Sequence, residues 1–436
     1  MKSDMPADWH ATPFRQLLAE PLRNGIYKPK EFHGHGAKIV NMGELFAHPR
    51  LRAVPMKRVE LSTSEKERFL LSKGDLLFAR RSLVAEGAGK CSIVLELDEP
   101  TTFESSIIRA RPDTSKAEPL YLYYFFSSSA GYHRLDTIRR QVAVSGITGS
   151  DLAKLEIPTP SPSVQRAIAH LLGTLDDKIE LNRRTSQTLV EMASALFRSW
   201  FVDFEGVVAK AAGREPSGIE RASASLFPSR FQDSELGPIP SGWHVNNAHE
   251  AAQVIYGAAF ASSLFNVHAR GHPLIRIRDL AEHDPQVWTT EQHPRRTLIS
   301  PGDIVVGMDG EFRAHVWRGP EAWLNQRVCK FCPHEPYGRA FVYFSLQEPL
   351  AEVERSEVGT TVIHLGKADI DRFRIVYATD GIHRAFHARV DPLVDLAVQI
   401  GLESRTLSRL RDALLPKLIS GDICLRDVER TVEAVA

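Results

Sequence analysis

Apolar residues recur every three or four positions along two long stretches of the sequence. In residues 164–201 the recurring residues are Val164, Ile168, Leu171, Leu175, Ile179, Leu189, Met192 and Leu196. In residues 382–418 they are Phe386, Val390, Leu393, Ala397, Ile400, Leu407, Leu410 and Leu414. This spacing predicts two long amphipathic helices, each with one heptad-like seam. Because a lone helix cannot bury its own seam, we expect the two to pack together; two separate helical hairpins are the alternative.

The two helical stretches belong to a longer internal repeat. Residues 151–157 (DLAKLEI) align with residues 369–375 (DIDRFRI), 218 positions later, and this offset holds without a gap as far as Ala195-Leu196 and Ala413-Leu414. Upstream, residues 72–77 resemble 300–305 at an offset of 228, and Trp9-His10 resembles Trp243-His244 at 234. Each copy therefore has a variable front and a constant back. Two copies are too few for a solenoid and predict a pseudo-two-fold molecule.

The fronts of the two copies, residues 37–110 and 272–345, contain short β-branched and aromatic runs broken by Gly, Pro and Asp. These runs predict strands at 38–40, 75–78, 107–108, 304–306 and 341–344, with turns at Gly74-Asp75 and Gly302-Asp303. Residues 206–240 are rich in Ala, Ser, Gly and Pro and predict a linker. The predicted fold class is α+β: two mixed α/β domains in a pseudo-two-fold arrangement, joined by two long helices packed as an antiparallel coiled coil. The predicted boundaries are 1–158 for the first mixed domain, 159–205 for the first long helix, 206–240 for the linker, 241–378 for the second mixed domain, 379–425 for the second long helix and 426–436 for a tail.

Composition narrows the function classes. Lys+Arg and Asp+Glu both number 54, so the formal net charge is zero and does not attract a polyanion such as DNA. A polyanionic partner would have to bind a local basic patch. Four widely spread cysteines fit a reducing cytosol, and no apolar stretch approaches the roughly 20 residues of a membrane span. No phosphate-binding loop, dinucleotide fingerprint or Asn/Asp-Pro-Pro-Tyr/Phe motif of amino-methyltransferases is present. Cys329, Cys332 and His334 are the best metal candidates, but a strand would point the two thiols to opposite faces, so we expect no metal site.

Arginines and one lysine cluster at similar places in the two fronts. The clusters are Arg80, Arg81 and Lys90, followed by Arg139 and Arg140, in the first copy, and Arg276, Arg278, Arg313 and Arg327 in the second. Arg276 and Arg278 are two apart, which predicts one face of a strand. Arginine suits bidentate reading of guanine, and both cations suit phosphate. These residues are our candidate DNA contacts; a solvated charged face is the alternative.

Three stretches resemble the Type I restriction–modification specificity subunits. Residues 171–184 (LLGTLDDKIELNRR) followed by 196–204 (LFRSWFVDF) resemble the central conserved region of that family. Residues 234–243 (SELGPIPSGW) resemble the entry into its second recognition domain, and 407–423, with 410–422 (LRDALLPKLISGD), its C-terminal conserved region. The fronts would then be target recognition domains, for which the resemblance is one of architecture.

The resemblance implies a cytoplasmic, non-catalytic subunit whose recognition domains each read half of a split site in double-stranded DNA, with the helices setting the spacer. It implies two methyltransferase subunits that modify adenine, with or without two restriction subunits, and no membrane. S-adenosylmethionine, ATP and Mg²⁺ would be bound by those partners and no cofactor by this chain. We place methyltransferase docking at Trp200, Phe201 and Phe204, which act as anchors if exposed; packing of that helix end onto a recognition domain is the alternative.

Other functions remain open at this point. The chain could be the specificity module of a methyltransferase that acts without restriction, or an interaction scaffold or DNA-binding module of another defence system. A fused methyltransferase or nuclease is a further alternative, against which the missing motifs and the chain length argue.

Overall fold

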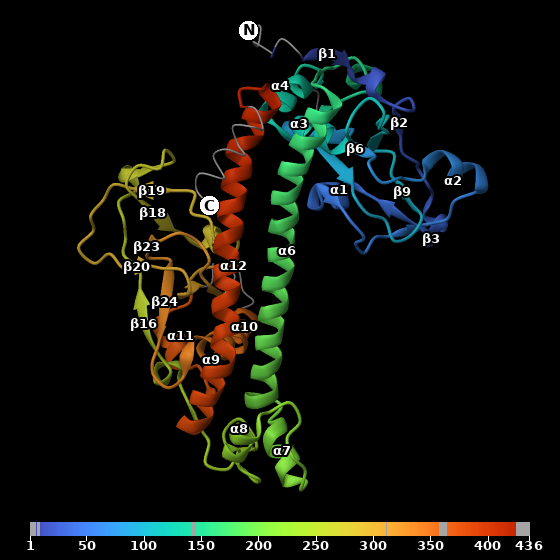
Figure 1. Ribbon diagram of the computed structural model, residues 1–436. Helices are drawn as coiled ribbons and strands as arrows, with labels where there is room; N and C mark the ends of the chain where they lie inside the picture. The colour runs from blue at the N-terminus through green and yellow to red at the C-terminus, as the bar shows by residue number, and fades with distance from the viewer. Residues whose placement is uncertain (1–5, 7–8, 141–144, 311, 357–363, 424–436) are drawn as a thin grey trace. The chain divides into compact units, whose positions relative to one another are not determined.

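The computed structural model describes residues 6, 9–140, 145–310, 312–356 and 364–423 (Figure 1). The chain divides into two compact units. Unit 1 comprises Met1–Lys178 and Leu407–Ala436, and unit 2 comprises Ile179–Thr406. The predicted tail, 426–436, lies outside the described residues.

Two long helices pass through both units. Helix α6 is Pro162–Phe201 and helix α12 is Asp380–Ser420, so their first residues are 218 positions apart, the offset of the sequence repeat. Gly421, with a φ of 79°, follows the last residue of α12, as is typical of a helix end.

Helices α6 and α12 pack against each other in antiparallel directions within each unit (Figure 1). In unit 1, Asp176 of α6 contacts Arg411 of α12. In unit 2, Ser186 bonds to the carbonyl of Ala397, and further along α6 the ring of Phe197 contacts that of Phe386. Position numbers rise along α6 while they fall along α12, which confirms the predicted antiparallel pair.

Unit 1 is built on a five-stranded sheet in the order β2-β10-β6-β8-β4, and the central pairs β10·β6 and β6·β8 are antiparallel. Strand β3 forms a second sheet with β5 and β9. The strands of unit 1 are β1 (His10–Pro13), β2 (Arg23–Asn24), β3 (His33–Val40), β4 (Arg50–Leu51), β5 (Arg58–Val59), β6 (Leu76–Ala79), β7 (Arg81–Ser82), β8 (Cys91–Val94), β9 (Thr101–Phe103), β10 (Ile107–Ala110), β11 (Ser145–Gly146) and β12 (Glu156–Thr159). Its shorter helices are α1 (Met42–Ala47), α2 (Thr63–Phe69), α3 (Pro119–Ser127), α4 (Ser129–Asp136) and α5 (Gly149–Leu152), with 3₁₀ turns η1 (Phe14–Leu17), η2 (Lys30–Phe32) and η3 (Ala85–Gly87).

Unit 2 repeats this plan. Its sheet β16-β24-β21-β22 matches β2-β10-β6-β8 in order and direction. The strands of unit 2 are β13 (Phe231–Gln232), β14 (Ile239–Pro240), β15 (His244–Asn246), β16 (Ala252–Tyr256), β17 (Phe265–Asn266), β18 (His272–Ile275), β19 (Trp288–Thr289), β20 (Leu298–Ile299), β21 (Ile304–Gly307), β22 (Ala314–Val316), β23 (Ala322–Leu324), β24 (Val328–Pro333) and β25 (Ile375–Tyr377). Its shorter helices are α7 (Glu205–Ala211), α8 (Arg221–Leu226), α9 (Gly338–Ser345), α10 (Gln347–Ser356) and α11 (Lys367–Asp371), with 3₁₀ turns η4 (Ala248–Glu250), η5 (Ser262–Leu264) and η6 (Ile277–Asp279).

A short strand pair leads into each long helix. In unit 1, β1 pairs with β12, with His10 opposite Thr159, and α6 starts three residues after Thr159. In unit 2, β15 pairs with β25, with His244 opposite Tyr377, and α12 starts three residues after Tyr377. The weak sequence match between Trp9-His10 and Trp243-His244 therefore marks corresponding strands.

Some sequence predictions were wrong or incomplete. Residues 341–344, predicted as a strand, belong to helix α9; Phe341, Val342 and Phe344 are all buried, so the run lacks the polar positions that reveal a helical period. The region 206–240, predicted as a linker, contains α7 and α8, and Val207 and Phe227 lie in the core of unit 2. Both predicted turns are confirmed, since Gly74 and Gly302 have positive φ just before β6 and β21.

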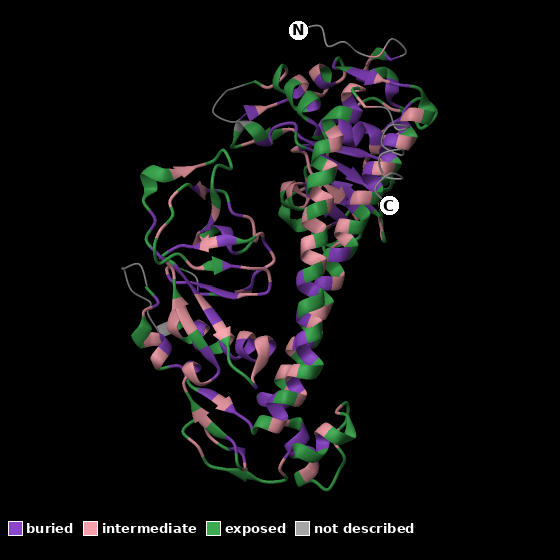
Figure 2. Ribbon diagram, turned by 60° about the vertical axis from the view of Figure 1, so that its left-hand side comes forward, coloured by how far each residue is buried: buried purple, intermediate pink, exposed green. Residues whose placement is uncertain are grey.

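Each unit has its own aromatic core. In unit 1, Phe14, Phe78 and Tyr121 pack with Leu172 of α6 and Leu418 of α12. In unit 2, Trp200, Trp243, Phe341 and Phe386 share one cluster. Figure 2 shows buried residues in the sheets of both units and mixed burial along the long helices.

Candidate nucleic-acid interface

Three loop segments of unit 2 meet beside the end of strand β21. Met308 N donates to the carbonyl of Arg327 at 2.9 Å, and Leu365 N donates to the carbonyl of Met308 at 2.8 Å. The next residue, Asp309, forms an antiparallel bridge with His364. The segments come from the end of β21, the turn before β24 and the residues before α11. We call this arrangement the unit 2 junction: Met308, Asp309, Gln326, Arg327 and His364.

Unit 1 has the same junction at corresponding positions. Arg80 N donates to the carbonyl of Ser106 at 2.8 Å, and Ile147 N donates to the carbonyl of Arg80 at 3.0 Å. Arg81 pairs with Gly146 between β7 and β11. We call Arg80, Arg81, Ser105, Ser106 and Gly146 the unit 1 junction. The two junctions therefore share these backbone contacts and carry different side chains.

The junction in unit 1 brings three predicted residues together. Arg80 and Arg81 belong to it, and Arg140 joins it through an antiparallel bridge to Gly146. Arg81 is exposed, whereas Arg140 donates to Asp151 at 2.9 Å. The segment 141–144, next to these residues, lies outside the described residues.

Two other predicted residues of unit 1 have structural contacts. The side chain of Arg139 is only 3% exposed; its Nε donates to the carbonyl of Ala88 at 2.8 Å and its guanidinium lies 4.3 Å from the ring centroid of Tyr132. The ammonium of Lys90 lies 5.0 Å from the ring centroid of Phe46, and the residue is exposed. Because Arg139 is buried and bonded inside unit 1, its contacts are those of a structural residue.

The predicted residues of unit 2 are less uniform. Arg327 lies in the junction, where Nη1 donates to both oxygens of Asp309 at 2.8 and 3.1 Å. Arg313 pairs with Glu354 of α10. The strand predicted for Arg276 and Arg278 is wrong, because β18 ends at Ile275 and Arg276 precedes the 3₁₀ turn η6. There Arg276 bonds to Asp279 at 3.0 Å, while Arg278 is exposed.

Sequence reasoning missed two junction residues, Asp309 and His364. His364 Nδ1 lies 2.7 Å from Asp309 Oδ1, and Arg327 uses the same carboxylate. Both lie outside the clusters of basic residues, so an aspartate and a lone histidine give no signal of their own in the sequence. Extending the repeat alignment at the offsets of 228 and 218 would have placed them opposite Arg81 and Gly146.

The predicted docking aromatics lie mostly inside unit 2. Trp200 is 1% exposed and Phe201 4% exposed, and both contact the ring of Phe386. Phe204 is half-buried and packs edge-on against Trp243. Trp200 and Phe201 are therefore not exposed, as docking anchors would have to be, and both rings pack inside unit 2. A docking role for the three residues stays a prediction.

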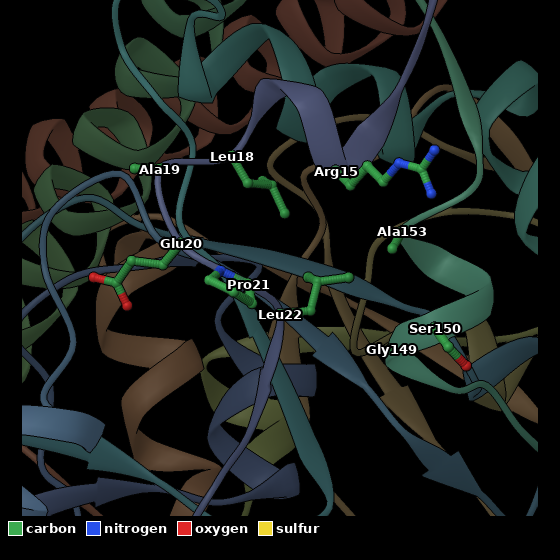
Figure 3. Close-up of a pocket in the computed structure, with 9 residues that line it drawn as sticks. All are labelled: Arg15, Leu18, Ala19, Glu20, Pro21, Leu22, Gly149, Ser150 and Ala153. Atoms are coloured by element: carbon green, nitrogen blue, oxygen red, sulfur yellow. The ribbon is translucent and has the colours of Figure 1, made fainter.

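Unit 1 also has a pocket of about 430 Å³ between η1 and α5 (Figure 3). Leu18, Pro21 and Leu22 lie near its middle, and the side chains of Arg15 and Glu20 point to opposite sides. Burial acts to raise the pKa of Glu20, but Arg109 and Arg111 outweigh it and hold the pKa below its usual value. Glu20 accepts hydrogen bonds from both arginines at 2.6 and 2.8 Å, so its carboxylate is already paired within the fold.

Two cysteines of the described part of the chain, Cys91 and Cys329, are buried. Cys329 is fully buried in β24, and burial raises the pKa of its thiol to about 12, whereas Cys332 is only half-buried. In the described part of the chain, no three His, Cys, Asp or Glu residues gather as metal ligands. None of the helices described there is long and apolar enough to cross a membrane.

Comparison with known proteins shows what the chain is similar to. Residues 23–191 match the family described as Type I restriction modification DNA specificity domain. The chain is 23% identical to the HindI specificity subunit of Haemophilus influenzae, over 81% of this chain and 87% of that protein. It is 26% identical to the MjaIX specificity subunit of Methanocaldococcus jannaschii, over 71% of this chain and 70% of that protein.

A solved structure shares the fold. The Type I restriction–modification S subunit from M. genitalium aligns with a TM-score of 0.59 and 16% identity, over 96% of this chain and 97% of that chain. The matched sequence family, the relatives aligned across most of their length and the repeated fold agree. Residues 23–191 thus match the Type I restriction modification DNA specificity domain, and most of the chain is similar to specificity subunits of Type I restriction enzymes.

Proposed function

We propose that this chain is the non-catalytic, target-reading subunit of a Type I restriction–modification complex, in which each unit reads one half of a split DNA target. The observation that carries the proposal is the recurrence of one junction in both units, with the same backbone bonds and different side chains. A shared frame with different side chains suits two domains that hold DNA alike and read different bases.

The paired helices would fix the distance between the two half-sites. An α-helix rises 1.5 Å per residue and has no soft joints, so a helix pair holds a spacing better than a loop does. Helix α6 has 40 residues and α12 has 41. Recognition of half-sites at a fixed spacing is how pseudo-symmetric DNA-binding proteins commonly combine two weak interactions.

The chemistry would belong to partner subunits. We assign adenine methylation, with S-adenosylmethionine, to two methyltransferase subunits that dock on this chain, and ATP-driven cleavage, with Mg²⁺, to restriction subunits where these are present. The chain itself would act in the cytoplasm. Formal neutrality, with 54 residues of each sign, fits a subunit whose partners supply further phosphate contacts.

Long-read methylation mapping tests the proposal. The chain is expressed with its methyltransferase subunit in a host that lacks other adenine methylation. The expected result is one split motif with a methylated adenine in each half, which disappears when this chain is omitted. A methylated motif that persists without the chain, or the absence of any motif from an assembled complex, would contradict the proposal and favour a scaffold.

Inserting one heptad into both α6 and α12 tests the role of the helices. The expected result is a longer spacer with both half-sites unchanged. An unchanged spacer in a folded and assembled complex would contradict the idea that the helices fix the distance between the half-sites. It would leave the proposal that each unit reads one half-site unaffected.

A further inference from the structure

The unit 2 junction contains a carboxylate that holds two exposed side chains at once. Arg327 Nη1 donates to both oxygens of Asp309, and His364 Nδ1 contacts Asp309 Oδ1 at 2.7 Å. The side chains of Arg327 and His364 are 56% and 52% exposed, whereas that of Asp309 is 18% exposed. The aspartate is therefore the sheltered member of the group, and the two side chains that it holds face solvent.

We infer that Arg327, positioned by Asp309, reads a guanine in the half-site recognised by unit 2. This inference rests on the proposed function and names a base contact for it. Asp309 would act as a positioning residue and Arg327 as the residue that touches DNA.

The hydrogen bonds leave one edge of the guanidinium available. Asp309 engages Nη1, and within the described part of the chain Nε and Nη2 of Arg327 have no partner. These two groups form a pair of parallel donors, which matches the O6 and N7 acceptors of guanine in the major groove. A free arginine must lose rotamer freedom when it binds, whereas one held by a carboxylate has already lost much of it.

The charge of the group favours a base over a phosphate. The carboxylate of Asp309 offsets the charge of Arg327 and would repel a phosphate brought close to it. At the corresponding place in unit 1, Arg81 stands where unit 2 has Asp309, and Ser106 where it has Arg327. Among the described residues of unit 1, Arg81 has no carboxylate partner at that position, so its full charge suits a phosphate. In unit 2, Asp309 offsets the charge of Arg327, which suits the edge of a base.

His364 lies beside Arg327 on the same exposed face of the junction, because Asp309 holds both side chains. Because an ionised carboxylate only accepts hydrogen bonds, Nδ1 of His364 must donate to Asp309, which leaves Nε2 facing outward. The pair of Arg327 and His364 is fixed to the backbone frame of the junction, since Met308 bonds to both of their segments. Loss of the Asp309 charge would loosen both side chains together.

Methylation mapping with variants tests the inference. Arg327→Ala and Arg327→Lys are compared with the unchanged chain, and Arg372→Ala, at a 76% exposed arginine of the same unit, is the matched control. In both Arg327 variants we expect one guanine of the second half-site to become unspecified, with the first half-site and the spacer unchanged. Because one bidentate contact discriminates by about 1–3 kcal/mol, the preference for guanine should fall by roughly 5- to 150-fold. Asp309→Asn should reduce the same preference by less.

The outcomes separate the inference from the proposed function. An Arg327→Ala complex that keeps both half-sites unchanged overturns the inference while the proposed function stands. Loss of all methylation by both Arg327 variants, in complexes that assemble normally, also overturns it, because the residue would then supply affinity and not discrimination. A motif that survives omission of the whole chain overturns the proposed function instead. Circular dichroism of the purified complexes shows whether each variant is folded.

Discussion

Arg411 Nη1 donates a hydrogen bond of 2.6 Å to Asp176 Oδ1, which joins α12 to α6 within unit 1 although the two residues are 235 positions apart in the sequence. Tyr124 Oη donates to the other oxygen of Asp176 at 2.7 Å. At the corresponding positions of unit 2, 218 residues away, stand Val394 and Ala193, which are both buried. The helix pair is thus held by a polar contact in one unit and by apolar packing at the matching place in the other.

Arg411→Ala should destabilise unit 1. It removes the nearer cation of the Asp176 carboxylate, whose side chain is 9% exposed, and leaves only Arg50, whose Nε lies 3.9 Å away. We expect a cost of about 2–3 kcal/mol, below the range for fully buried pairs because the Arg411 side chain is 28% exposed. The measurement is the midpoint of thermal unfolding, with Arg409→Ala, at an exposed arginine of the same helix, as the control.

The triple variant Asp176→Val, Arg411→Ala, Tyr124→Phe makes the contact between α6 and α12 in unit 1 apolar, as it is at the matching positions of unit 2. It removes the poorly paired carboxylate and the Tyr124 hydroxyl together, while Arg50 keeps its 3.0 Å bond to Asp177, so it should be more stable than Arg411→Ala alone. A triple variant less stable than the single one would show that the ion pair contributes more than its desolvation costs.

The two turn aspartates should differ in importance. Asp75 and Asp303 each accept a backbone hydrogen bond of 2.8 Å from the serine three residues earlier. Asp75 is 1% exposed and makes two bonds of 2.8 Å to Arg111, whereas Asp303 is 22% exposed and bonds to Lys330. Removing a buried partner costs about 3–5 kcal/mol and a more exposed one about 1 kcal/mol. Asp75→Ala should therefore lower the unfolding free energy more than Asp303→Ala in denaturant titrations, and equal losses would contradict this ranking.

His383 should make unit 2 sensitive to acid. It is fully buried among Phe201, Phe341 and Tyr337, and burial lowers its pKa to about 3, against the opposing effect of Glu250. Between this value and the unfolded pKa of about 6.5, the unfolded chain binds a proton that the folded chain does not. The contribution of neutral His383 to the free energy of unfolding is therefore fully present above about pH 6.5. It falls with acidification below that pH, by up to about 1.4 kcal/mol per pH unit.

The repeat supplies the variant that tests this. Gln165 occupies the corresponding position of unit 1, where it accepts a hydrogen bond from Glu118 N and donates one to the carbonyl of Pro160, both at 2.9 Å. In His383→Gln the amide oxygen can accept from Ala378 N, which now donates to His383 Nε2 at 3.0 Å. The fall in unfolding midpoint between pH 7 and pH 5 should shrink in this variant, while His268→Gln, at an exposed histidine, should keep the full fall.

The helices could be predicted from the sequence because their signal is local. A seam repeated over 40 residues and an offset of 218 kept without a gap fix both the helices and their pairing. The junctions are assembled from segments that are far apart, such as Arg80, Ser106 and Ile147, and each residue alone looks like an ordinary loop residue. Periodicity cannot bring such segments together, so the basic clusters located the right loops and missed Asp309 and His364. The helices α7 and α8 were missed because each has only seven or six residues, too few to show a period.

Arg81 and Arg139 should separate DNA binding from folding within unit 1. Arg139 is internally bonded and 3% exposed, so Arg139→Ala should lower the unfolding free energy by about 1–3 kcal/mol, since it leaves the carbonyl of Ala88 without its donor. Arg81 is exposed in the junction, so Arg81→Ala should leave the unfolding midpoint unchanged. If Arg81 contacts one phosphate, its loss lowers the slope of log Kobs against log salt concentration by roughly 0.9 for duplex DNA. The assembled complex, titrated with a duplex that carries the mapped target at several salt concentrations, gives this slope. A slope changed by Arg139→Ala and not by Arg81→Ala would reverse the two assignments, because the buried guanidinium would then have to leave Tyr132 and Ala88 to reach the DNA.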